Sequence, residues 1–200
     1  MRKLAVLATL LLSFSAIAQE GPIISSAIIA IDRNQDLVEA KKFIDEAAEI
    51  ISTKPGGEIG EKDMAKFYYY QGLINYRVFL SDNQELKSQD TNTLDKALKG
   101  FTNLIEFEQK VDRDRYSDEA KEQLQYVAND IAKRAIEAAQ KKQFRTSYND
   151  FIKTYEIKKS PVVGITDTAM LYNAAIMAQN AKMYDKALAH NQTLKELGYK

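Results

Sequence analysis

The chain has 200 residues, with 28 lysines and arginines balanced by 28 aspartates and glutamates, and it contains no cysteine. A balanced charge provides no basic excess of the kind that holds nucleic acid. The lack of cysteine excludes disulfide bonds and thiol chemistry. This length fits one domain or one short array of repeats.

The first 18 residues are predicted to be a secretory signal peptide. Arg2 and Lys3 form a positive start, an apolar run covers residues 4–14, and the small-x-small sequence AIA at residues 16–18 is a cleavage site. The run is too short to span a membrane comfortably as a helix. An uncleaved membrane anchor is the alternative reading. We therefore expect an exported protein without an integral membrane segment after cleavage.

Residues 19–200 are predicted to be all-helical, because apolar residues recur at three- and four-residue steps and strand signals are nearly absent. Proline and glycine end helices at residues 53–57 and 158–161. A polar loop is expected over residues 81–92. The predicted fold is an α-solenoid of about four antiparallel helix pairs, at about residues 23–52, 63–110, 117–156 and 167–198.

The second helix of each predicted pair carries the same stripe of residues. A small residue comes first, with a mostly apolar residue four positions later and another seven positions later, so all three lie on one helical face. The small residue allows the preceding helix to approach closely. The four stripes are Ala40, Ile44 and Ala47; Ala97, Phe101 and Leu104; Ser147, Phe151 and Thr154; and Ala187, Asn191 and Leu194.

Two further features support a repeat. The tetrapeptide DKAL occurs at residues 95–98 and again at 185–188, each time at the start of a second helix, where aspartate suits the helix dipole. The first helices carry small residues of their own, and we expect Gly72 and Ala175 to lie where two helices cross most tightly.

These features resemble the tetratricopeptide repeat, a 34-residue helix-turn-helix unit that stacks into a superhelix. Residues 169–197 match well, and residues 131–155 give a second match. The segments 66–76 and 94–107 give a third, with a longer loop between them than the family has. The signature positions in the last match are Leu171, Ala174, Ala175, Ala178, Tyr184, Ala187 and Leu194.

The style of the signal peptide and of residues 171–199 resembles large exported repeat proteins of Bacteroidetes. That resemblance implies a periplasmic or outer-membrane-associated protein of a Gram-negative bacterium. The resemblance to the tetratricopeptide repeat implies that the first helices line a concave groove. The groove residues would be Lys66, Tyr69, Leu73, Tyr76 and Arg77 in the second pair, and Tyr172, Ile176, Gln179 and Asn180 in the fourth.

Tyrosine and arginine are favoured in protein interfaces because they combine a large contact area with hydrogen bonding. The alternative for these aromatic residues is simple packing between repeats. We expect a non-catalytic scaffold that holds a protein or peptide partner, with self-association at the C-terminal end as a second form of this class. A carbohydrate-binding or enzyme-accessory protein of the cell envelope is the alternative, since aromatic rings also stack on sugars.

No pattern in the sequence indicates a catalytic, metal or cofactor site. The single histidine, His190, has no partners at metal-ligand spacing. The glycine-rich segment 56–62 lacks the ending that cradles phosphate. Carboxylates such as Glu106 and Glu108 are predicted to lie on solvated helix faces, so no cofactor and no nucleic-acid partner is expected.

Overall fold

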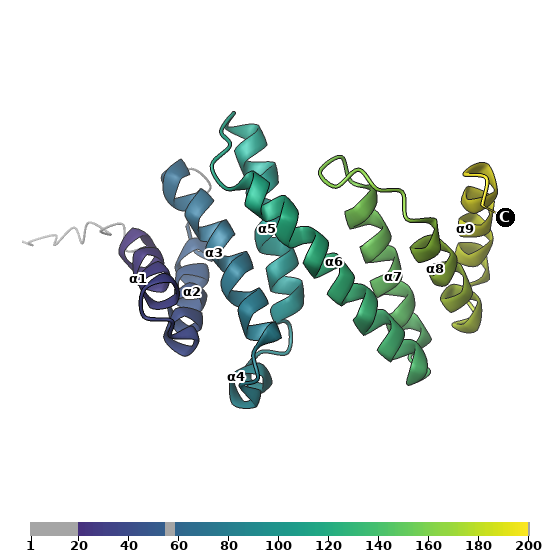
Figure 1. Ribbon diagram of the computed structural model, residues 1–200, viewed down its shortest axis with the longest axis horizontal. Helices are drawn as coiled ribbons and strands as arrows, with labels where there is room; N and C mark the ends of the chain where they lie inside the picture. The colour runs from purple at the N-terminus through teal and green to yellow at the C-terminus, as the bar shows by residue number, and fades with distance from the viewer. Residues whose placement is uncertain (1–19, 55–58, 200) are drawn as a thin grey trace, which may run out of the picture.

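The computed structural model describes residues 20–54 and 59–199, and the predicted signal peptide lies outside these ranges. The described residues are all-helical and contain no strand, as the sequence predicts. The helices, in chain order, are α1 (Glu20–Asp32), α2 (Leu37–Ser52), α3 (Glu61–Leu80), α4 (Gln84–Gln89), α5 (Thr93–Lys110), α6 (Ser117–Gln140), α7 (Phe144–Lys159), α8 (Thr168–Asn180) and α9 (Tyr184–Glu196) (Figure 1).

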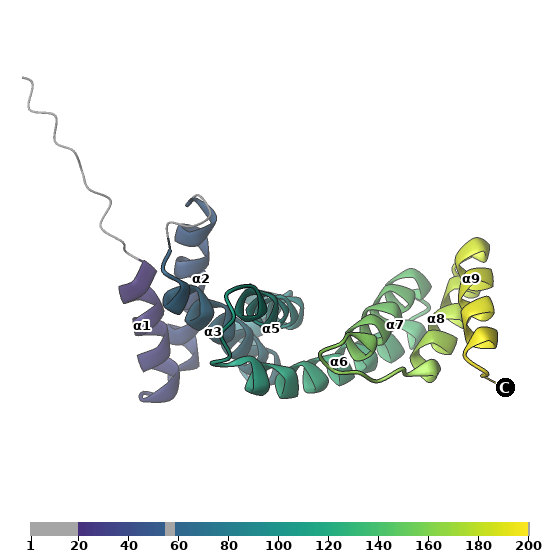
Figure 2. The same cartoon turned by 90° about the horizontal axis from the view of Figure 1, so that it is seen from above.

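The long helices form two rows along the long axis of the molecule. Seen from above, α1, α3, α6 and α8 lie in one row, and α2, α5, α7 and α9 lie in the other (Figure 2). Each long helix packs against the next one along the chain. None of the helices in the described ranges is long and apolar enough to cross a membrane.

Burial confirms the predicted stripes on the second helices. The three stripe residues of α2, α5 and α7 are all between 0% and 3% exposed. On α7, the hydroxyl of Ser147 donates a hydrogen bond of 2.7 Å to the backbone carbonyl of Ala135, so the small position directly contacts the preceding helix. On α9, Ala187 and Leu194 are buried while Asn191 is exposed.

The helices α3 and α5 approach each other closely where they cross at two glycines. A Cβ atom added to Gly72 would lie 2.7 Å from the ring of Phe101. One added to Gly100 would lie 2.8 Å from the carbonyl oxygen of Tyr68 and closer still to the backbone of Gly72. The predicted tight crossing at Gly72 is therefore confirmed, and the structure adds Gly100 as its partner.

The turns between α6 and α7 and between α8 and α9 have the same hydrogen bonds forty residues apart. Lys142 (φ 58°) and Lys182 (φ 61°) hold the left-handed conformation just after the preceding helix. In both turns the next N–H donates to the carbonyl five residues back, at 2.8 Å, as in a Schellman motif. The α1–α2 turn also contains a left-handed residue, Gln35 (φ 54°).

The prediction that residues 81–92 form a polar loop is corrected, because this segment contains the short helix α4. Asn83 caps this helix by accepting a hydrogen bond of 3.0 Å from the backbone N–H of Leu86. Leu86 is 5% exposed, so one buried apolar side chain holds the insertion in place. A single apolar residue within a polar stretch gives no helical periodicity to detect.

The prediction that Glu108 lies on a solvated helix face is also wrong. Its side chain is buried, with 1% exposed. Its carboxylate accepts hydrogen bonds from the backbone N–H groups of Arg115, Tyr116 and Ser117 and from the Ser117 hydroxyl, at 2.7 to 3.3 Å. The carboxylate at the end of α5 thus satisfies free N–H groups at the start of α6. It fixes the angle at which one helix pair leads into the next.

Candidate functional site

The predicted groove residues on α3 do not form one open surface. Tyr76, expected to face a groove, is 7% exposed, and its hydroxyl donates a hydrogen bond of 2.7 Å to Asp130 on α6. Burial and this bond to a carboxylate raise the pKa of Tyr76 above its ordinary value. The predicted placement of Tyr76 in an open groove is therefore wrong, because its side chain is buried in a cluster with residues of α5 and α6.

Three of the other predicted groove residues on α3 already contact neighbouring side chains. Tyr69 stacks on Tyr116, with ring centroids 4.7 Å apart and planes 15° apart. Leu73 packs against the core, and Lys66 donates a hydrogen bond to Asp63. Arg77, the one exposed member, borders a hollow of about 400 Å³ whose other lining residues are Ile31, Asp32, Gln35 and Leu37.

The predicted residues on α8 lie far from those on α3, with α5, α6 and α7 between them (Figure 1). Tyr172 is 41% exposed, and its ring centroid lies 5.3 Å from that of Tyr199. Ile176 is half-buried, while Gln179 and Asn180 are exposed. The structure does not bring the two predicted sets together into one site.

A cleft that the sequence reading missed lies between α5 and α7, above α6. Its volume is about 400 Å³. Figure 2 shows α5 and α7 apart from each other on the same side of α6, which runs past both. The cleft is lined by Thr102, Ile105, Glu106 and Gln109 of α5, Leu124 of α6, Glu156 and Ile157 of α7, and Ser160, Pro161 and Val162 of the following turn.

The floor of the cleft is apolar and its upper walls carry carboxylates. Ile105 and Leu124 are 2% and 4% exposed, whereas Ile157 is only half-buried and remains accessible from the cleft. Glu106 and Glu156 are exposed and stand on opposite walls. An apolar floor with a few polar groups around it is the usual composition of a binding site.

Hydrogen bonds hold the turn that closes the cleft beyond α7. The backbone N–H of Gly164 (φ 70°) donates to the carbonyl of Ser160 at 2.8 Å, and that of Ile165 donates to Lys158 at 2.7 Å. The side chain of Lys158 also donates to Asp167 at 2.9 Å. This wall is therefore built into the fold and does not need a ligand to form it.

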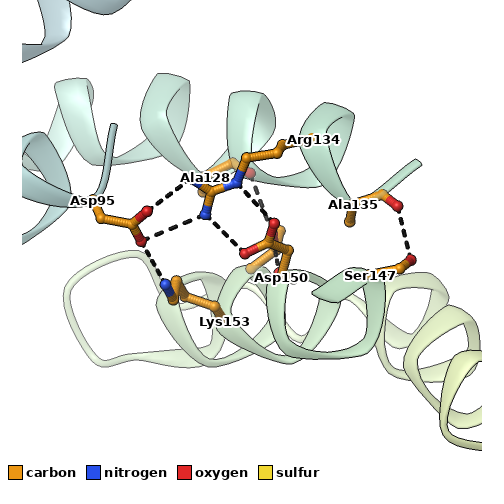
Figure 3. Close-up of polar contacts among 8 residues, drawn as sticks. Asp95, Ala128, Arg134, Ala135, Ser147, Asp150 and Lys153 are labelled. Carbon is orange, nitrogen blue, oxygen red and sulfur yellow. Dashed lines mark hydrogen bonds and ion pairs between the residues drawn. The ribbon is translucent and has the colours of Figure 1, made fainter. Parts of the chain in front are cut away.

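A network of charged side chains joins α5, α6 and α7 near the start of α5 (Figure 3). Arg134 of α6 donates to Asp150 through two nitrogens at 2.8 Å and to Asp95 at 2.7 Å. Lys153 of α7 donates to Asp95 at 2.5 Å. Asp95 thus ties α5 directly to α7 and sets their separation at this end.

The network also sets the charge state of its members. Burial alone would raise the pKa of Asp95, but hydrogen bonds from Arg134 and Lys153 lower it below the ordinary value. The pKa of Arg134 is raised by its two carboxylate partners despite the burial that opposes this. Asp95 and Arg134 therefore both stay charged at neutral pH, which keeps the ion pair between α5 and α6.

His190 belongs to a helix contact. Its Nε2 atom lies 3.0 Å from the hydroxyl of Tyr148 on α7, and burial followed by the nearby charge of Lys186 lowers its pKa. In the described parts of the chain, no group of three or more potential ligands gathers where it could hold a metal ion.

No protein-family model matches the chain, and no match is found among curated proteins or among solved structures. The candidate site is therefore defined by its geometry and chemistry alone.

Proposed function

We propose that the protein is an exported, non-catalytic scaffold that binds a protein or peptide segment. We propose further that its helices form a repeat array of the tetratricopeptide-like kind. The equivalent turns at Lys142 and Lys182 and the buried stripes on successive second helices support the array. The export follows from the signal-like residues 1–18.

The cleft between α5 and α7 is the observation that carries this proposal. It combines a volume of about 400 Å³, an apolar floor and walls braced by the Asp95 network and by the turn after α7. A pre-formed site of this kind avoids the entropy cost of ordering loops around a ligand. Binding is therefore proposed at this cleft between second helices instead of a groove along the first helices.

The chemistry of the cleft supports binding without catalysis. Its two exposed carboxylates, Glu106 and Glu156, stand on opposite walls, and its described lining residues include no histidine, lysine or tyrosine to share a proton with them. The lining also contains no aromatic ring, which a sugar would need for stacking. The cleft thus favours a peptide side chain over a carbohydrate.

A peptide-display selection against residues 19–200 tests the proposal. We expect enriched peptides to lose binding when Ile157→Glu or Val162→Asp places a charge in the cleft, with helix content retained by circular dichroism. Arg77→Ala and Tyr172→Ala, which alter the two sets on α3 and α8, should leave binding intact. Peptides that bind both cleft variants as well as wild type would contradict the proposal, as would selective binding of glycans.

A further inference from the structure

We infer that the cleft between α5 and α7 selects a peptide segment in which an apolar side chain is flanked by lysine or arginine. This inference rests on the proposed function, and it names the class of partner. Two exposed carboxylates on the walls and an apolar floor between them define this partner.

The walls present negative charge that the protein does not neutralise. Glu106 and Glu156 are exposed, and neither forms an ion pair with another residue in the described ranges. The lining that the structure describes contains no lysine or arginine, although the whole chain carries as many basic as acidic residues. The cleft is therefore locally acidic within a protein of balanced charge.

The lysines nearest to these walls along α7 are held elsewhere. Lys153 binds Asp95, and Lys158 binds Asp167. Lys159 lies over the ring of Tyr155, 5.4 Å from its centroid. Each lysine of the second half of α7 thus has its own partner. On α5, Lys110 follows Glu106 by four residues and is exposed, and no ion pair joins the two within the described ranges. Both glutamates therefore remain open to an external cation.

The apolar floor of the cleft favours an apolar side chain between the two flanking cations of the ligand. Ile105, Leu124, Ile157 and Val162 leave an apolar hollow in which a leucine-sized side chain loses its contact with water. An acidic peptide would be repelled by the walls, and a fully polar one would leave the floor unfilled. The ligand must therefore carry both the flanking cations and the apolar side chain between them. The walls attract the cations and repel acidic peptides, so both effects contribute to selectivity.

Fluorescence anisotropy with short labelled peptides tests this inference. The probes carry lysine-leucine-lysine, glutamate-leucine-glutamate or lysine-serine-lysine at the centre of one neutral sequence. We expect the first to bind at least about tenfold more tightly than either of the others, and its affinity to fall as salt is added because exposed charges are screened.

The double variant Glu106→Gln and Glu156→Gln removes the proposed cation partners and should weaken binding of the lysine-leucine-lysine peptide by about tenfold. The matched control, Glu137→Gln with Glu196→Gln, removes two exposed charges away from the cleft and should change nothing. Circular dichroism verifies that both double variants keep their helix content.

The outcomes separate the inference from the proposed function. Equal affinity for lysine-flanked and glutamate-flanked probes, or an unchanged affinity in the Glu106 and Glu156 double variant, overturns the inference. The proposed function still stands in that case if Val162→Asp abolishes binding of display-selected peptides. Binding that also survives Val162→Asp overturns both.

Discussion

The tetrapeptide DKAL stands at the start of α5 and again at the start of α9, and its alanine has the same role in both places. Ala97 is 0% exposed and Ala187 is 7% exposed. Each lies on the buried stripe of a second helix, against the helix that precedes it. This shared role depends only on the helical period and on the size of the residue.

The aspartate and the leucine of the two tetrapeptides lie in different surroundings. Asp95 joins Arg134 and Lys153 in the brace between helices, whereas Asp185 forms no ion pair within the described chain. Leu98 packs against the core, whereas Leu188 is 70% exposed. The shared tetrapeptide therefore places its alanine on the buried face of each helix, while the neighbouring helices determine the contacts of the aspartate and the leucine.

The reason lies in the position of each helix within the array. The middle helix α5 packs against α3 and α6, so most of its faces have partners. The helix α9 packs against α8 at the far end of the array (Figure 1). A repeat motif read from sequence thus predicts packing within a pair better than contacts between pairs.

The largest expected effect is at the position three residues after the shared alanine, which is Gly100 in α5 and His190 in α9. Gly100→Ala should lower the free energy of unfolding by about 2 kcal/mol or more, because its Cβ would press on the backbone of Gly72. His190→Ala should cost less than about 1 kcal/mol. Urea denaturation followed by circular dichroism measures both.

Gly60 provides the control, since an added Cβ meets nothing within 4 Å there. Gly60→Ala should cost about 1 kcal/mol or less, because Gly60 is the N-cap of α3 and alanine is a weaker residue at that position. If Gly100→Ala were as mild as Gly60→Ala, the crossing of α3 and α5 would be looser than the structure shows.

The second effect contrasts the two aspartates. Asp95→Asn should destabilise by about 1 kcal/mol, since its charged hydrogen bonds are discounted for partial exposure. Asp185→Asn should stay within about 0.5 kcal/mol of wild type. A double-mutant cycle between Asp95→Asn and Lys153→Met measures the coupling across α5 and α7, and a coupling near zero would contradict the brace.

The third effect is a loss of folding stability at acidic pH. Asp90 accepts hydrogen bonds from Lys41 and from Lys96 of the first DKAL; burial opposes ionisation, yet these bonds lower its pKa to about 2. Because the folded pKa is below the unfolded one, this stabilisation is present above about pH 4 and is lost as the pH falls towards 2.

We expect the acid-sensitive contribution of Asp90 to be about 1 kcal/mol after allowance for solvent screening. Stability measured between pH 5 and pH 2 should therefore fall less steeply in Asp90→Asn than in wild type. Parallel curves for the two proteins would show that Asp90 has the same pKa in the folded and unfolded states.

The smallest effect tests the equivalence of the two repeated turns. Lys142→Gly and Lys182→Gly should each raise stability by about 0.5 kcal/mol, because glycine adopts a positive φ without strain. Gln192→Gly, inside α9, should lower it by a similar amount. Opposite signs for the two lysine variants, measured by thermal unfolding, would argue against equivalent turns.

The sequence allowed prediction of what depends on local periodicity. The helix pairs and the buried stripes follow from residues three, four and seven apart, and the observed helices agree with the predicted ranges to within a few residues. Gly72 was identifiable because a glycine within a helical stripe indicates a close approach. The insertion α4 was not, because its only buried apolar residue is Leu86.

The cleft and its brace depend on residues far apart in sequence. Asp95 and Lys153 are separated by 58 positions, and no local pattern pairs them. Tyr76 likewise donates a hydrogen bond to Asp130, which is 54 positions away. The apolar residues around Pro161 were visible in the sequence, but their place beside α5 depends on how α5 and α7 separate around α6.

Methyl NMR during titration with the lysine-leucine-lysine peptide tests the central claim most directly, because it locates the binding site. We expect the largest shift changes at the cleft residues Ile105, Leu124, Ile157 and Val162, and no change at the exposed Leu188 of α9. Changes centred instead on Leu73 of α3 or Ile176 of α8, with the cleft methyls unmoved, would contradict it.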